Sequence, residues 1–149
     1  MASRLGGVRD LLERLLRLWT QPVGDHAEAE AAFGRVYADP VVVNGATTTV
    51  AELVDRARSL QQSFDRLSMQ ILEQVETPNR VVIAFMMRGR QVGTYVSPLG
   101  SVPPTGRDVH VRTIDVLVIE GGLVSAIWVV ADDLGLLTQL DAVSLAHQG

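Results

Sequence analysis

The sequence contains no cysteine and no lysine, and the absence of cysteine narrows what the protein does. Without cysteine the chain forms no disulfide, offers no thiolate to a metal and has no cysteine nucleophile. All 13 basic residues are arginine, and 17 acidic residues outnumber them, which leaves a formal net charge of -4. Binding to the phosphates of a nucleic acid requires a basic face, so we expect no nucleic-acid partner.

Motifs for metals, nucleotides and covalent catalysis are also missing. His26, His110 and His147 are far apart, and none has the spacing of a metal-binding pair. There is no glycine-rich phosphate loop and no Gly-x-Ser-x-Gly nucleophile motif. The glycines in segment 89–93 interrupt a strand pattern that no helix follows. We therefore expect neither a bound metal nor a cofactor.

Long apolar runs are absent as well. The apolar residues over 8–19 alternate with charged ones, unlike the core of a signal peptide. No segment approaches the roughly 20 apolar residues that span a bilayer. We expect a cytoplasmic protein without a membrane partner. The 149 residues, 47% of them hydrophobic, suit a single domain over 1–149 with a sizeable core.

What the sequence does contain is a series of helical patterns followed by strand patterns. Apolar spacing predicts a helix over 8–19, Asp25 caps a second helix that runs to about Tyr37, and the Thr49-x-x-Glu52 capping box opens a third. Period-two patterns and turn residues predict the following elements: strands over 41–43, 69–75, 80–96, 109–119 and 123–131, a loop over 98–106 and a short helix over 134–140. Strands joined by hairpins are antiparallel, and helices on one side of them make an α+β domain. A bent sheet of this kind, with helices across its open face, encloses a pocket for a small hydrophobic ligand.

One acidic residue interrupts an apolar strand. Asp115 lies within the strand predicted over 109–119. A buried carboxylate must be paired, protonated or in contact with a wet cavity, because it is costly to bury otherwise. In a cavity its raised pKa would suit a general acid or base. An edge position, or an ion pair with Arg88, Arg90 or Arg112, explains the residue equally well, and the sequence leaves both interpretations open.

Uncharged polar and aromatic residues on neighbouring segments are candidates for ligand binding. Gln91 shares one strand face with Met87, and from a pocket wall it would orient a carbonyl or hydroxyl group. Glutamine is also an ordinary surface residue. Tyr95 could donate its hydroxyl to a ligand or pack with that hydroxyl at the rim. Asn44 could also contact a ligand, although a turn explains it better, and Trp128 could form a pocket wall, although a core position is the usual one for tryptophan.

The C-terminal half carries a combination of short motifs. RGRQVG over 88–93 is followed by PPTGR over 103–107, Ile114-Asp115 and EGG over 120–122, and after Trp128 comes DDLGLLTQL over 132–140. This combination resembles the SnoaL-like polyketide cyclase family, within the nuclear-transport-factor-like superfamily. The first half of the chain is similar only in the order of its helices.

The resemblance implies a cone-shaped α+β barrel, with a curved antiparallel sheet covered by N-terminal helices, that often forms a homodimer through the sheet. It implies a pocket for a polyketide-like ester, where an acid on the last strand moves the proton for an aldol closure. The position of that acid falls at Val129, and a histidine common on the long strand falls at Gln91. Asp115 remains at a position that faces the pocket in relatives.

Two hypotheses follow. The first is a cyclase, or an enzyme that opens or hydrolyses an epoxide, with Asp115 as the catalytic acid or base and Arg88 tuning its pKa or steadying negative charge. The second is a non-catalytic binding protein that lost the usual acid. The residues predicted to contact the substrate are Gln91, Tyr95, Asn44, Arg88, Trp128, Val129 and Met87.

Overall fold

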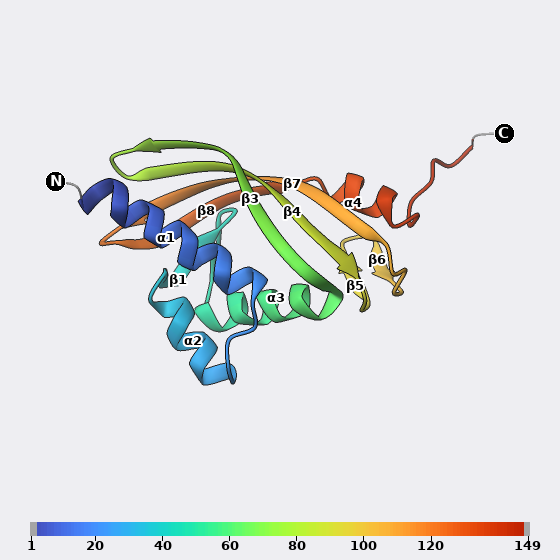
Figure 1. The fold of residues 1–149 in the computed structure, drawn as a ribbon, viewed down its shortest axis with the longest axis horizontal. Helices are drawn as coiled ribbons and strands as arrows, with labels where there is room; N and C mark the ends of the chain where they lie inside the picture. Colours follow the sequence, from blue (N-terminus) through green and yellow to red (C-terminus); the bar gives the residue numbers. More distant parts are fainter. Residues whose placement is uncertain (1–2, 148–149) are drawn as a thin grey trace.

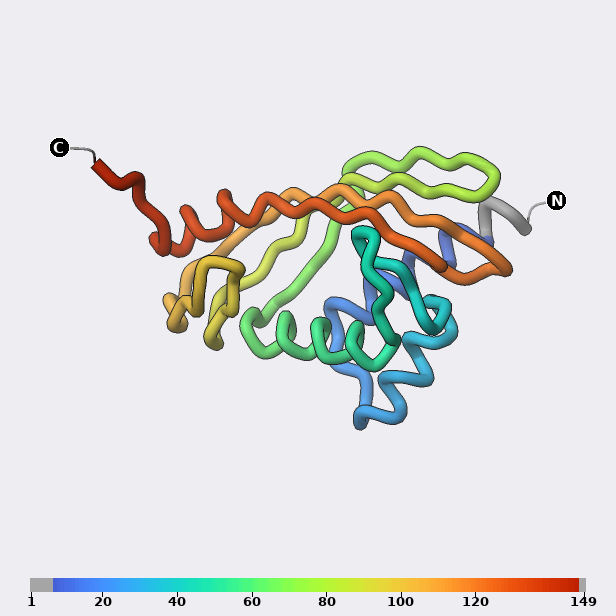
Figure 2. Tube along the Cα trace, turned by 180° about the vertical axis from the view of Figure 1, so that it is seen from behind, coloured from blue at the N-terminus to red at the C-terminus, as the bar shows by residue number. Residues whose placement is uncertain are grey.

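The computed structural model describes residues 3–147 and shows three N-terminal helices gathered under one curved sheet (Figure 1). The helices are α1 (Ser3–Thr20), α2 (His26–Gly34) and α3 (Val50–Ser63). A fourth helix, α4 (Asp133–Gln139), lies toward the opposite end of the sheet from α1 (Figure 2). Among the helices of residues 3–147, none combines the length and hydrophobicity that a bilayer span requires.

Local hydrogen bonds start the helices where the sequence predicts them. The Thr49 side chain accepts a hydrogen bond from the Glu52 backbone N–H, and the Glu52 carboxylate accepts one from the Thr49 N–H, both at 3.1 Å. Asp25 and Glu28 form the same reciprocal pair at the start of α2. These bonds satisfy donors that the first turn of a helix leaves free. Helix α2 ends at Gly34, earlier than predicted, because the chain enters a strand at Tyr37.

Six strands form the main sheet, in the order β2-β1-β8-β7-β4-β3. Their bounds are β1 Tyr37–Val43, β2 Ala46–Thr48, β3 Phe64–Thr77, β4 Arg80–Gln91, β7 Asp108–Glu120 and β8 Leu123–Ala131. Two short strands, β5 (Tyr95–Ser97) and β6 (Gly100–Val102), pair with each other beside it. The predicted α+β class, with helices covering a curved sheet, is confirmed.

Three details of the sheet differ from prediction. The sheet is mixed, because β1 pairs with β8 in parallel; a long connection between two strands permits this, whereas a hairpin does not. It is open, with β2 and β3 at its edges, so it does not close into a barrel. The strand predicted over 80–96 ends at Gln91, and the loop predicted over 98–106 contains β6.

Alternation along β7 decides which side chains enter the interior. Val109, Val111, Thr113, Asp115 and Leu117 are all buried, while the residues between them are more exposed. Asp115 therefore belongs to the row that faces the helices. The interior divides into two apolar clusters: the larger lies between α1, α2, α3 and the sheet, and the smaller lies near α4.

Candidate active site

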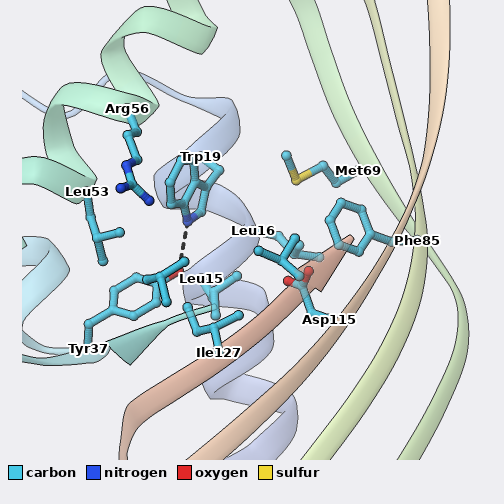
Figure 3. A pocket seen from close by; sticks show the side chains of 12 residues that line it. Leu15, Leu16, Trp19, Tyr37, Leu53, Arg56, Met69, Phe85, Asp115 and Ile127 are labelled. Carbon is cyan, nitrogen blue, oxygen red and sulfur yellow. Dashed lines mark hydrogen bonds between the residues drawn. The ribbon is translucent and has the colours of Figure 1, made fainter. Parts of the chain in front are cut away.

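A cavity of about 170 Å³ lies between the helices and the inner face of the sheet (Figure 3). A cavity of roughly 150 Å³ holds a molecule the size of benzene, so this one accommodates one ring or a short chain. Its walls are almost entirely apolar, with a few polar groups. The lining residues are Leu15, Leu16, Trp19, Tyr37, Val43, Leu53, Arg56, Met69, Phe85, Asp115, Ile127 and Val129.

The carboxyl group of Asp115 enters this cavity from an apolar stretch of the sheet. Its cross-strand neighbours are Ile83 on β4 and Val129 on β8. The residue is 8% exposed, and within the described residues its Oδ1 atom has no hydrogen-bond partner. Burial raises the pKa of this carboxyl from its usual 3.8 to about 7. Both protonation states are therefore populated near neutral pH.

The three arginines considered in the sequence analysis as partners for Asp115 contact other residues instead. Arg88 donates to Gln70 at 3.2 Å, and Arg90 forms an ion pair with Asp65 at 2.8 Å. Arg112 lies 3.7 Å from Asp132. All three alternate with inward-facing residues and so point away from the cavity. The ion-pair interpretation of Asp115 is therefore wrong.

A second polar group in the cavity is the hydroxyl of Tyr37. It accepts a hydrogen bond of 2.7 Å from the indole N–H of Trp19, and the structure gives it no acceptor among the described residues. Its own hydrogen is therefore free to donate. Stacking on Phe33, at a centroid distance of 5.9 Å, holds the ring. Burial raises the pKa of Tyr37, and the nearby Asp115 charge raises it further, so the phenol stays neutral.

The third polar group is the guanidinium of Arg56, which comes from α3. This side chain is exposed, whereas Asp115 is buried, so the cavity reaches the surface on the side of Arg56. Figure 3 shows Arg56 beside Trp19 and Asp115 on the sheet side of the cavity. Within residues 3–147, no three histidine or carboxylate side chains gather closely enough to hold a metal ion.

Comparison with known proteins gives the family. A sequence model of the SnoaL-like polyketide cyclases matches residues 9–140. The chain belongs to the SnoaL-like polyketide cyclase family. Among proteins with curated functions, none matches the chain.

Solved structures of relatives share the fold at low sequence identity. TsrD from Streptomyces laurentii has 23% identity and a TM-score of 0.77, over 93% of this chain and 97% of that one. A SnoaL-like polyketide cyclase from Agrobacterium tumefaciens C58 has 17% identity and a TM-score of 0.70, over 89% and 96%. A protein of ketosteroid isomerase-like fold from Catenulispora acidiphila, solved with trimethylamine, has 15% identity and a TM-score of 0.67, over 89% and 93%.

Only two of the predicted site residues of this SnoaL-like chain line the cavity, and they are Asp115 and Val129. The two are direct cross-strand partners. The carboxyl group of Asp115 thus lies next to the position where the family resemblance expects an acid. Whether Asp115 transfers a proton stays a prediction.

Gln91, predicted to orient a ligand, is fully buried outside the cavity. Its amide nitrogen donates to the carbonyls of Gly93, Val102 and Pro103 at 3.1 to 3.2 Å. Its amide oxygen accepts from the N–H and hydroxyl of Thr105 at 3.0 and 2.6 Å. These bonds fasten the loop after β6 to the end of β4, so the side chain has no capacity left for a ligand.

The remaining predicted residues also lie outside the cavity. Met87 packs in the smaller cluster near α4, and Tyr95 packs on Phe64 at a centroid distance of 5.6 Å. Asn44 adopts a positive φ of 50° in a turn and hydrogen-bonds the backbone of Val129. Arg88 is exposed on the outer side of β4. Trp128 is 58% exposed on the outer side of β8, which excludes it from this wall.

Sequence reasoning missed the other ten lining residues, and three of these, Trp19, Tyr37 and Arg56, carry polar groups. The helical spacing of Trp19 from Leu15 marked it only as a core residue. The sequence pattern predicts Tyr37 at the end of a helix, whereas in the structure it opens β1. Arg56 lies on the polar side of an amphipathic pattern, where an arginine is ordinary, so the sequence held no signal for it.

Proposed function

We propose that this chain is a cyclase-type enzyme in which Asp115 moves a proton on a hydrophobic, carbonyl-containing substrate. The observation that carries the proposal is a buried, unpartnered carboxyl in an apolar cavity. Because burial raises its pKa to about 7, the group is a stronger base than an exposed aspartate and still releases its proton near neutral pH.

In the proposed reaction, the Asp115 carboxylate removes a proton from the carbon next to a substrate carbonyl. The electron pair of the C–H bond moves onto the carbonyl oxygen and forms an enolate. The Tyr37 O–H donates a hydrogen bond to that oxygen, and the Trp19 N–H holds Tyr37 in position. The enolate carbon then bonds to a second carbonyl carbon, and protonated Asp115 returns its proton to the resulting alkoxide.

The size of the cavity limits how a substrate binds. About 170 Å³ has room for a single ring, which is much less than a polycyclic polyketide. We therefore expect either a small substrate or a larger one that inserts only its reacting end. The rest would extend past Arg56, where the cavity reaches the surface.

The same carboxyl supports a second reaction, the opening of an epoxide, for which protonated Asp115 would donate to the epoxide oxygen. The two reactions differ in pH dependence. If Asp115 is the base, the rate rises with pH through about 7; if it is the acid, the rate falls through the same range. A binding protein without catalysis would show saturable binding of a hydrophobic ligand without turnover, and this behaviour would be insensitive to Asp115→Asn.

A substrate-independent test uses 5-nitrobenzisoxazole, a bicyclic probe that reports a base in an apolar site. Removal of its C–H proton breaks the N–O bond and releases a coloured cyanophenolate. We expect Asp115→Asn to slow this reaction by about 10²- to 10⁴-fold, since general acid–base catalysis contributes that much. Asp108→Asn, an exposed change on the same strand, should keep the rate.

A loss of less than about threefold in Asp115→Asn, with the variant folded, would exclude Asp115 as the base. The absence of any acceleration by the unmodified protein, at probe concentrations where binding to the cavity is detected, would exclude it as well. This probe reacts only with a base, so its rate should rise with pH through about 7; the pH profile of the natural reaction is what distinguishes a base from an acid.

We also propose that the chain forms a homodimer through the outer face of its sheet. Ile114 and Val130 are cross-strand partners there and are 54% and 76% exposed, and Trp128 lies beside them. Adjacent exposed apolar side chains of this kind mark contact sites. Sedimentation should show a dimer, which Val130→Arg dissociates while Val75→Arg, on the exposed β3–β4 hairpin, does not. A monomeric unmodified chain would refute this proposal.

The cytoplasmic location stays a prediction of the sequence.

A further inference from the structure

We propose that Arg56 makes this site specific for substrates that carry a carboxylate, bound at the mouth of the cavity while the apolar body of the molecule reaches Asp115. The inference rests on the proposed function, because Asp115 defines the reacting end. It adds a chemical class of substrate and a specificity-determining residue on α3.

The charges of the cavity support this assignment. Among the lining residues, Arg56 is the one cation and Asp115 the one anion. Within residues 3–147, Arg56 forms no ion pair; its neighbour Asp55 contacts His26 at 3.3 Å instead. An arginine at the edge of an apolar cavity, with no acidic partner, is therefore available to a charged group of a ligand.

Arg56 and Asp115 also act at separate ends of the cavity. Burial is what raises the pKa of Asp115, and no arginine offsets that increase, so the guanidinium does not neutralise the carboxyl. Figure 3 shows the same separation, with Arg56 on the helix side and Asp115 on the sheet side. A ligand that meets both groups has its anion at one end and its reacting carbon at the other.

The geometry of an arginine favours a carboxylate as that anion. A planar guanidinium donates two parallel hydrogen bonds to the two oxygens of one carboxylate, and these charge-assisted bonds are among the strongest in proteins. Arg56 also lines a second hollow, of about 480 Å³, between α3 and β5. Arg56 therefore lines both hollows, so a carboxylate bound to it has space on the second side for further substituents.

Binding of two matched probes tests the inference without knowledge of the substrate. The probes are 3-phenylpropanoate and its neutral amide, which differ in charge but little in shape. Trp19 lines the cavity, and Trp128 is the other tryptophan of the chain, so Trp128→Phe leaves fluorescence that reports the cavity alone. Calorimetric titration of the unmodified protein repeats the comparison without that substitution.

We expect the propanoate to bind about 10- to 100-fold more tightly than the amide, as a charge-assisted pair would give. Arg56→Gln should remove that preference and leave the affinity for the amide unchanged. Arg56→Lys should restore only part of it, because an ammonium group lacks the bidentate geometry. Arg80→Gln, which removes an exposed arginine at the start of β4, should have no effect.

Equal affinities for the two probes, or an unchanged preference in Arg56→Gln, would refute the role of Arg56 and leave that of Asp115 intact. Asp115→Asn should retain the preference for the propanoate, which separates binding from proton transfer. If neither probe binds by either method, the cavity does not admit such ligands and this inference fails. The role of Asp115 as a base is tested separately, by the benzisoxazole assay.

Discussion

Asp115 and Gln91 are buried polar residues on neighbouring strands, and they differ in what surrounds them. The Gln91 amide is fully buried and hydrogen-bonded through both its nitrogen and its oxygen. The Asp115 carboxyl is almost as buried, yet its Oδ1 atom has no partner within the described residues. A satisfied buried group stabilises the fold, whereas an unsatisfied one destabilises it and remains available to a ligand.

The packing around the two residues explains the difference. After Gln91 the chain passes so close to α3 that a Cβ atom on Gly93 would lie 2.3 Å from the carbonyl oxygen of Gln62. The loop that contains Thr105 then folds over the Gln91 amide. At Asp115 the helices cover the sheet without filling the space above it, which leaves the cavity. Backbone thus closes over the Gln91 side chain, whereas a cavity remains beside the Asp115 side chain.

The largest expected effect that tests this contrast between Asp115 and Gln91 is a change in the free energy of unfolding of Asp115→Asn. The pKa of Asp115 is 3.8 ordinarily and about 7 in the folded protein, so the folded state binds the extra proton between these values. The stability contributed by the protonated carboxyl is therefore present at low pH and decreases as the pH rises from about 4 to 7. The full shift corresponds to ~4 kcal/mol.

Asparagine has no such titration. We expect Asp115→Asn to be more stable than the unmodified protein at pH 8, by up to ~4 kcal/mol, and to differ little at pH 4. Urea unfolding at both pH values measures the difference, with Asp108→Asn as the exposed control. If Asp115→Asn and the unmodified chain depend on pH in the same way, the carboxyl is not buried as described.

A somewhat smaller change in the free energy of unfolding, this time a decrease, is expected when Gln91 is replaced. Gln91→Leu removes the partners of the Val102 carbonyl and the Thr105 N–H, so we expect a decrease of ~3 kcal/mol in the free energy of unfolding. Gln74→Leu, on the exposed part of β3, is the matched control. Thermal and urea unfolding give the value. A loss below ~1 kcal/mol would mean that the hydrogen bonds of Gln91 contribute little, and the contrast with Asp115 would disappear.

Much of the fold could be predicted because its causes are local. The capping pair of Thr49 and Glu52 spans three residues, and each strand pattern needs only the alternation of its own side chains. Asp115 could be found in the same way, because a charge inside an apolar strand stands out without any knowledge of its surroundings. Its burial, and its separation from the arginines of β4, could not.

The other site residues could not be predicted because a cavity depends on contacts between distant elements. Alternation placed Met87 and Gln91 on one face of their strand, but it does not say which face is inward or where along β4 the interior is hollow. Trp19, Tyr37 and Arg56 come from α1, β1 and α3, and nothing in their own segments marks them as neighbours of Asp115. The parallel pairing of β1 with β8 is likewise a contact between segments far apart in sequence.

By itself the sequence determined most of the succession of elements and singled out one carboxyl within an apolar strand, because caps, alternation and turns act over a few residues. Only the tertiary structure decided that this carboxyl meets an empty space while Gln91 meets the backbone of a loop. That outcome depends on how far the helices stand from the curved sheet, a distance set by the packing of all the side chains between them.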